Sequence, residues 1–298
     1  MARQDFTFDG TSDILWRDAF TGEVGYWDIS AGIYPSWNSF GFVDNSWKIV
    51  DTGNYVNGDF GGGSDDVLWR NFSTGEVGYW DVINGDAVAY VGLGSVSLDW
   101  QVASNSGSFD FTGDGEDDVL WRNLNTGEVY TWDMESGYVA AAGSQGFVEL
   151  SWNIITTDDF TGNGTDDILW RNSQTGEIGY WTNGPDYVSL GLVSNSWQVA
   201  STGDFSADGS SDFLWRNLDT GEVYIWDLEG GFVASAGSLG FVDLSWEIQG
   251  TGDYTGDGAE DVLWRDSGTG EVGYWEMDQG GAFSFVSFGA VSNEWMIA

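Results

Sequence analysis

One pentapeptide pattern recurs six times along the 298 residues and constrains the fold more than any other feature of the sequence. The pattern is Asp, an apolar residue and then Leu-Trp-Arg, and it begins at Asp13, Asp66, Asp118, Asp167, Asp212 and Asp261. The successive spacings are 53, 52, 49, 45 and 49 residues. Repetition at this period is typical of propellers and solenoids, in which each unit buries its apolar face against its neighbours.

Each repeat has the sequence pattern of four short strands. The first is a Trp-x-Ile/Val run such as that beginning at Trp197, and the second is the pentapeptide. A tight Asn-x-x-Thr-Gly turn leads to the third strand, as in residues 23–27, and a variable segment with several glycines forms the fourth. Short strands separated by glycine turns, four to a repeat of this length, predict the blades of a β-propeller.

The two ends of the sequence are in matching phase. Residues 295–298 align with residues 197–200, and aligning Asp5 with Asp204 places Met1 where that strand ends. The last strand would therefore complete the blade that the first residues begin, which leaves no free edge blade. We predict an all-β fold for residues 1–298: a single closed six-bladed β-propeller, with four antiparallel strands in each blade and both termini in one blade.

An Asp-rich loop lies between the first and second strands of five repeats. Oxygen-bearing side chains occupy its positions 1, 3, 5 and 9, and Gly occupies position 6 in each. A hard cation such as Ca²⁺ takes about six to eight oxygen ligands, and alternating ligands and spacers allow a chain to wrap around it. The predicted metal ligands are Asp5, Thr7, Asp9 and Asp13; Asp110, Thr112, Asp114 and Asp118; Asp159, Thr161, Asn163 and Asp167; Asp204, Ser206, Asp208 and Asp212; and Asp253, Thr255, Asp257 and Asp261.

The second repeat departs from this loop pattern. Its segment from Asp59 to Asp66 is one residue short and has Gly at ligand positions, and residues 54–57 form an insertion. We therefore expect about five calcium ions and an empty second blade. Asp-Gly loops also form ordinary β-turns, but five copies with ligand spacing favour calcium.

The charge balance is strongly acidic. Asp and Glu number 48 against 8 Lys and Arg, which gives a net charge of −40. Without neutralising cations this charge would destabilise a compact fold. We expect no nucleic-acid partner and no membrane insertion, because the sequence has neither a basic patch nor an apolar run of about 18 residues. The first residues do not resemble a signal peptide, which predicts an excised domain or export without a cleaved N-terminal signal.

The loops and the Leu-Trp-Arg segments together resemble the FG-GAP/VCBS-type repeats of bacterial extracellular proteins, whose loops are related to those of the integrin α-subunit propeller. The resemblance covers essentially the whole chain. It implies a propeller with calcium held between the first two strands, and roles in adhesion and in carbohydrate or protein binding. The chain departs from the family in having Thr or Ser at loop position 3, where the family often has Asn or Asp, so each site carries fewer charges.

Two further repeated residue types are interpreted as structural. Each repeat has one Arg, and we predict that it pairs with the Glu of Thr-Gly-Glu across the hairpin turn. The repeated Trp residues are predicted to pack between blades, with sugar stacking as the alternative. The aromatic residues outside the repeat pattern are better candidates for a ligand surface: Tyr34, Trp37 and Phe40.

These observations favour a calcium-binding extracellular or cell-surface module that recognises glycans or cell-surface proteins, in the manner of a lectin or an adhesin. One alternative is a structural part of a secreted fibre, surface layer or large adhesin. A second is a polysaccharide lyase or hydrolase. The sequence contains no His and no Cys, which excludes Ser/His, Cys/His and zinc chemistry. Because nearly every acidic residue belongs to the repeat, no catalytic pair stands out, and we predict that the chain is not an enzyme.

Overall fold

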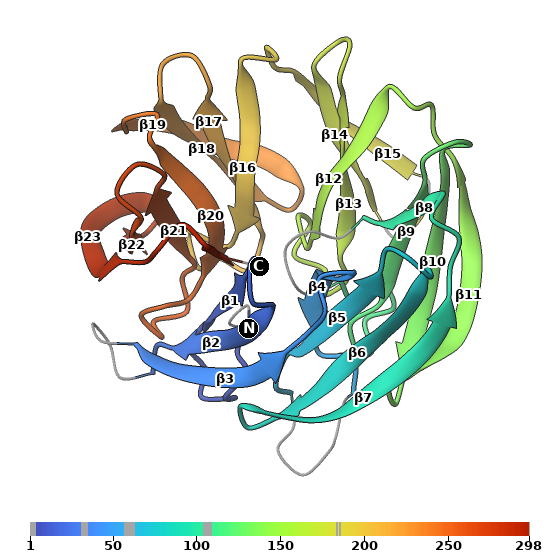
Figure 1. The fold of residues 1–298 in the computed structure, drawn as a ribbon. Coiled ribbons are helices and arrows are strands. Elements are labelled where there is room, and N and C mark those ends of the chain that lie inside the picture. Colours follow the sequence, from blue (N-terminus) through green and yellow to red (C-terminus); the bar gives the residue numbers. More distant parts are fainter. Residues whose placement is uncertain are drawn as a thin grey trace. The chain divides into compact units, whose positions relative to one another are not determined.

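The structure is a computed structural model that describes residues 4–30, 35–56, 63–103, 109–182, 184 and 186–297. These residues form 24 β-strands and contain no helix. The strands assemble into six four-stranded antiparallel sheets (Figure 1). The predicted fold class is therefore confirmed: the chain is an all-β, six-bladed β-propeller. No helix in the described residues is long and apolar enough to cross a membrane.

The first, fifth and sixth blades belong to one compact unit, formed by Met1–Asn45 and Ser196–Ala298. The first blade contains β24 (Trp295–Ile297), β1 (Ile14–Asp18), β2 (Glu23–Asp28) and β3 (Ser36–Phe42). The fifth contains β16 (Trp197–Gly203), β17 (Asp212–Asn217), β18 (Glu222–Glu229) and β19 (Phe232–Phe241). The sixth contains β20 (Trp246–Gly252), β21 (Asp261–Asp266), β22 (Glu271–Asp278) and β23 (Gly281–Ala290).

The second, third and fourth blades belong to the other unit, Ser46–Asn195. The second blade contains β4 (Trp47–Gly53), β5 (Asp66–Asn71), β6 (Glu76–Ile83) and β7 (Asp86–Ser95). The third contains β8 (Trp100–Val102), β9 (Val119–Asn123), β10 (Glu128–Glu135) and β11 (Tyr138–Phe147). The fourth contains β12 (Trp152–Asp158), β13 (Asp167–Asn172), β14 (Glu177–Thr182) and β15 (Asp186–Leu192).

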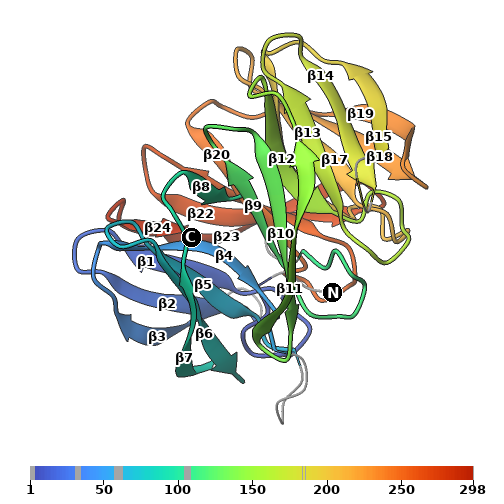
Figure 2. The ribbon, with the colours of Figure 1, turned by 90° about the vertical axis from the view of Figure 1, so that its right-hand side faces the viewer.

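The two termini share the first blade, as predicted. Strand β24 pairs with β1 in an antiparallel register that places Trp16 opposite Ile297 and Asp18 opposite Trp295 (Figure 2). The backbone amide of Ala19 donates to the carbonyl of Glu294 at 3.0 Å and extends the pairing beyond the strand. The first blade is thus built from both ends of the chain.

The hairpin turn between the second and third strands of each blade is fixed by an Asn or Asp side chain. In the second blade, Asn71 Oδ1 accepts the backbone amides of Ser73 at 2.8 Å and Thr74 at 3.0 Å. Gly75 follows with φ of +77°, and a Cβ there would lie 2.4 Å from the carbonyl oxygen of Val96. A side chain is excluded at this position, which explains the invariant Gly of each Thr-Gly-Glu segment.

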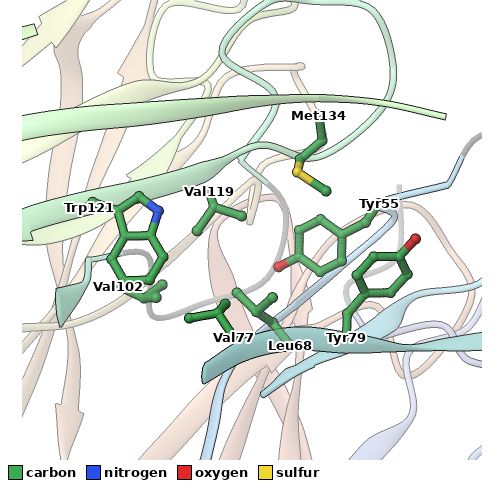
Figure 3. Packing of buried hydrophobic residues seen from close by; sticks show 8 residues of the cluster. All are labelled: Tyr55, Leu68, Val77, Tyr79, Val102, Val119, Trp121 and Met134. Carbon is green, nitrogen blue, oxygen red and sulfur yellow. The ribbon is translucent and has the colours of Figure 1, made fainter. Parts of the chain in front are cut away.

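The hydrophobic core lies between neighbouring blades of a unit. Leu68 and Val77 of the second blade pack against Val119 and Trp121 of the third in one buried cluster (Figure 3). All five residues of β9 are buried because both faces of the strand are covered. This arrangement confirms the predicted core role for the Trp of the second strands. The six buried Trp residues are Trp16, Trp69, Trp121, Trp170, Trp215 and Trp264.

Candidate functional site

The Asp-rich loop of five blades folds around its first carboxylate. In the third blade, Asp110 Oδ1 accepts the backbone amides of Gly113 at 2.6 Å and Asp114 at 3.3 Å, while Oδ2 accepts that of Gly115 at 2.8 Å. Gly115, at loop position 6, has φ of +88°, which favours glycine. The first carboxylate accepts the amides of positions 5 and 6 in the other four loops as well.

The side chains at positions 3 and 5 lie beside the first carboxylate. In the sixth blade, Thr255 Oγ1 is 3.4 Å from Asp253 Oδ1. The Asp257 carboxylate accepts the amide of Ala259 at 2.9 Å and so closes the second half of the loop. Positions 1, 3 and 5 therefore carry oxygen-bearing side chains on one short, glycine-turned segment.

The ninth residue is buried and anchors the loop through hydrogen bonds from backbone amides. Asp261 is fully buried, and its Oδ2 accepts the amides of Tyr254 at 3.0 Å and Thr255 at 3.1 Å. Its Oδ1 accepts the amide of Met277 at 3.0 Å. The ninth carboxylate thus ties its own loop to the third strand of the blade. Asp13, Asp118 and Asp212 make the corresponding pairs of hydrogen bonds.

Burial perturbs these ninth carboxylates strongly. Burial, with added repulsion from Asp5, raises the pKa of Asp13 to about 8. Burial likewise raises the pKa of Asp212 to about 8 and that of Asp261 to about 7. In each case the loop carboxylate at position 1 contributes repulsion. Each loop therefore concentrates negative charge that a bound cation would relieve.

Positions 1, 3 and 5 carry the oxygen-bearing side chains that calcium prefers, and the ninth carboxylate lies close to them, since repulsion from position 1 contributes to its raised pKa. Carboxylate and hydroxyl oxygens are the ligands that Ca²⁺ prefers, and the peptide carbonyl of position 7 commonly adds to them. Within the described ranges, however, no group of three acidic side chains is arranged to hold a metal ion. Calcium would take its protein ligands from the first half of each loop, and water would complete its coordination.

In the second blade, Asp66 makes the same two hydrogen bonds as the ninth residue of four other blades, but the sequence before it lacks the acidic loop pattern. Asp66 Oδ2 accepts the amide of Tyr55 at 3.1 Å, and Oδ1 accepts that of Val82 at 2.8 Å. Asn54 and Tyr55 therefore occupy the places that Asp110 and Phe111 hold in the third blade. The predicted alignment of this loop, with residues 54–57 as the insertion, is wrong, because the extra residues follow Tyr55. Residues 57–62 lie outside the described part of the chain.

The residue at loop position 8 connects neighbouring loops, a role that the sequence analysis missed. Asp117 Oδ2 accepts the amide of Asn54 in the preceding blade at 2.6 Å, and Asp166 Oδ2 accepts that of Asp110 at 2.8 Å. Burial raises the pKa of Asp117 well above its usual range. The sequence contains a signal for this role. A second Asp directly precedes the pentapeptide in the third and fourth blades, although a ligand at position 9 needs only one acidic residue.

The predicted aromatic ligand surface does not form one cluster. Tyr34 lies outside the described residues. Phe40 packs on Tyr26 with ring centroids 5.0 Å apart, whereas Trp37 packs on Trp295 at 4.9 Å. Trp37 also lies over Gly25, and because Gly25 and Tyr26 are adjacent in a strand, they face opposite sides of the blade. Trp37 and Phe40 are therefore on opposite faces, and Phe40 belongs to the packed interior.

The predicted pairing of each Arg with a Glu is also wrong for the well-described third blade. Arg122 donates to the carbonyl oxygens of Gly127 at 2.5 Å and Val148 at 2.8 Å, and not to Glu128. Arg122 lies opposite Val129 across the hairpin. Because Glu128 is adjacent to Val129, its side chain points to the other face of the sheet.

No protein-family model matches the chain, and no curated protein is significantly similar to it in sequence. The resemblance to FG-GAP/VCBS-type repeats therefore stays a prediction. Solved structures do match. The Photorhabdus luminescens Tc holotoxin pore superposes with a TM-score of 0.57 at 14% identity, over 88% of this chain and 13% of the toxin chain.

A streptogramin B lyase structure matches with a TM-score of 0.53 at 9% identity, over 95% of this chain and 80% of the lyase. Virginiamycin B lyase from Staphylococcus aureus matches with a TM-score of 0.50 at 8% identity, over 92% of this chain and 79% of that chain. Likenesses at this level of identity show the fold alone.

Proposed function

We propose that this chain is a calcium-dependent, non-catalytic recognition module that binds glycans or proteins at cell surfaces. The observation that carries the proposal is the repetition of exposed apolar side chains at one position of the blade. The last residue of the fourth strand is 69–74% exposed in four blades: Phe42, Phe147, Leu192 and Phe241. Large apolar side chains repeated at the same position of several blades offer a partner one contact point in each of those blades.

We propose that the acidic loops bind the calcium on which recognition depends. They lie at the opposite end of each blade from these apolar residues, since the second strand begins at the loop and ends at the hairpin turn. Positions 1, 3 and 5 supply at most two formal charges to each ion. Sites with few charged ligands suit extracellular calcium, at which modules commonly bind with Kd of about 10⁻⁴ to 10⁻³ M. We therefore propose that the module works outside the cell.

A structural role in a secreted assembly is the second candidate. The fourth strands stand at the edges of their sheets and reach ten residues in β7, β11, β19 and β23. Long exposed edges can pair with strands of other chains. Sedimentation velocity with calcium separates the two candidates: a binding module stays monomeric across concentrations, whereas an assembly component forms ordered polymers.

The direct test of recognition is binding to a glycan array and to intact cells, run with millimolar calcium and again with EDTA. The proposal expects saturable binding with calcium that is lost in the chelator. Magnesium at the same concentration is the control, because its demand for octahedral geometry disfavours these loops. Absence of binding to both arrays and cells in calcium would overturn the proposal.

A further inference from the structure

An aromatic side chain on the fourth strand is clamped in a fixed position in four blades. Trp37, Tyr90, Tyr187 and Phe285 lie at equivalent positions, each opposite the Trp of the third strand. Each packs edge-on against the Trp that opens the first strand of its blade, with centroids 4.9–5.8 Å apart. Trp37 therefore has a counterpart in other blades, although no other blade has Trp there.

A glycine beneath each ring completes the clamp. A Cβ on Gly25 would lie 2.6 Å from the Trp37 ring, and one on Gly273 would lie 2.6 Å from the Phe285 ring. The ring therefore rests directly on the backbone of the third strand. The third and fifth blades reverse the arrangement: Tyr130 and Tyr224 replace the glycine, and Ala142 and Ala236 replace the aromatic residue.

The clamped rings remain exposed despite these contacts. Trp37 is 40% exposed, Tyr187 is 38% exposed and Phe285 is 42% exposed. A ring held by a perpendicular Trp on one side and by backbone below loses little conformational entropy when a ligand covers its open surface. This distinguishes the three rings from freely rotating apolar side chains on the surface.

A carboxylate and a hydroxyl group accompany the ring in three blades. Ser39 Oγ donates to Glu23 Oε1 at 3.0 Å, and Ser287 Oγ donates to Glu271 Oε1 at 2.8 Å. The fourth blade has the same pair, with Ser189 Oγ 3.3 Å from Glu177 Oε1. The second blade has Gly92 in place of the Ser, so its set is incomplete.

We infer that the first, fourth and sixth blades each carry a subsite for one neutral pyranose unit of a glycan. The apolar face of the sugar stacks on Trp37, Tyr187 or Phe285, and its hydroxyl groups bond to the adjacent Glu and Ser. This inference rests on the proposed recognition function and names the ligand class and the site. The repeat pattern of the sequence places the three subsites in different blades, which favours a polymeric or clustered glycan over a single sugar.

The charge of the subsites selects neutral sugars. Each subsite contains a carboxylate, and the repeated Arg of the sixth blade, Arg265, has its guanidinium committed to the carbonyl oxygens of Trp295 and Ser292. With a net charge of −40 on the chain, a sulfated or uronate-rich glycan would be repelled. The free lone pairs of the Glu carboxylate can accept from sugar hydroxyl groups, whereas an apolar peptide would cover this carboxylate without supplying donors.

The test is affinity electrophoresis of the full chain, in calcium, through gels containing a neutral glucan, mannan or galactan, with heparin as the anionic probe. The wild-type chain is expected to be retarded by at least one neutral polymer and not by heparin. Replacing Trp37, Tyr187 and Phe285 together by Ala should weaken that retardation at least about tenfold, because truncated aromatic anchors commonly cost that much.

A control variant and a second subsite variant complete the test. Replacing Tyr138 and Phe232 by Ala removes aromatic residues that are each 67% exposed but open the fourth strands of the third and fifth blades, which carry no subsite, and retardation should persist. Glu271→Gln combined with Glu23→Gln keeps the side-chain shape and should weaken binding even if the triple Ala variant unfolds.

The outcomes also separate this inference from the proposed function. Retardation that survives both sets of subsite variants, or that occurs only in heparin, overturns the inference and leaves a recognition module with another site. Binding to cells without retardation by any neutral polymer also overturns it. A wild-type chain that binds neither cells nor polymers overturns both proposals.

Discussion

The guanidinium carbon of Arg122 lies 5.0 Å from the centroid of the Trp170 ring in the next blade. Arg122 also donates to the carbonyl of Val148 at 2.8 Å, in the connection that leads to that blade. Arg70 and Trp121 repeat the relationship one blade earlier at 5.2 Å, and Arg216 and Trp264 repeat it in the other unit at 5.3 Å. In these three pairs the Arg fastens one blade to the next within a unit.

This relationship predicts that Arg122→Lys destabilises the chain. Lys cannot reproduce the fork of hydrogen bonds or the planar stacking, and a buried hydrogen bond from a charged group is worth about 1.5–3 kcal/mol. We expect a loss of about 2 kcal/mol in the free energy of unfolding, measured by urea denaturation. Glu128→Gln is the matched control and should change stability by less than about 0.5 kcal/mol. An equal loss of unfolding free energy in both variants would instead support an ion pair between Arg122 and Glu128.

The sixth-blade loop predicts different effects for its ninth and fifth residues. Asp261→Ala removes the acceptor of buried amides from Tyr254 and Met277, so it should cost about 2–4 kcal/mol whether or not calcium is present. Asp257→Ala removes one partly buried turn contact and should cost about 1 kcal/mol in EDTA. In calcium, the Asp257 variant should also lose the stabilisation of one site.

Differential scanning calorimetry of both variants, with EDTA and with millimolar calcium, checks these expectations. A calcium response that disappears in Asp261→Ala but persists in Asp257→Ala would return the ninth residue to the role of ligand.

Asp66 predicts a pH dependence in the blade that is not expected to bind metal. Burial raises the pKa of Asp66 well above its usual range, and repulsion from Asp81 adds to the shift, although the amide of Val82 opposes it. A raised folded-state pKa contributes stability that is present below the unfolded pKa and is lost as the pH rises through the folded value. The wild-type chain should therefore lose stability relative to Asp66→Asn as the pH rises.

The measurement is urea unfolding of both proteins in EDTA at about pH 4.5 and about pH 8, which lie on either side of a raised carboxyl pKa. The stability deficit of Asp66→Asn should be smaller at the higher pH. A deficit that stays constant or grows would show that Asp66 is ionised in the fold across this range.

The glycine beneath each clamped ring is predicted to be required for two reasons: a side chain there would collide with a backbone carbonyl of the fourth strand and also with the ring. A Cβ on Gly179 would lie 2.2 Å from the carbonyl oxygen of Val188 and 2.5 Å from the Tyr187 hydroxyl. Gly179→Ala should therefore cost about 1–3 kcal/mol through strain, and adding Tyr187→Ala should not restore the loss. Thermal unfolding of the single and double variants tests this; full rescue by the second change would mean that only the ring conflicts.

The repeat made the strands and blades predictable, because period, turn residues and apolar pattern all agree on one fold. The roles of individual side chains were harder to predict from the sequence. A ninth carboxylate that binds calcium and one that binds the amides of Phe111 and Met134 give the same spacing, so the sequence could not separate them. The clamp could not be predicted for another reason. Trp37 and Tyr130 each pack against the Trp that opens the first strand of their blade. They come from different strands, however, so an alignment of the repeats does not match them.

Isothermal titration of the metal-free chain with Ca²⁺ decides whether the acidic loops are weak calcium sites that stabilise the module outside the cell. We predict binding to about five sites with Kd of about 10⁻⁴ to 10⁻³ M. Each site should add about 2.7 kcal/mol to the unfolding free energy at a hundredfold excess over Kd. No binding heat, together with an unfolding midpoint that is the same in calcium and in EDTA, would contradict the account.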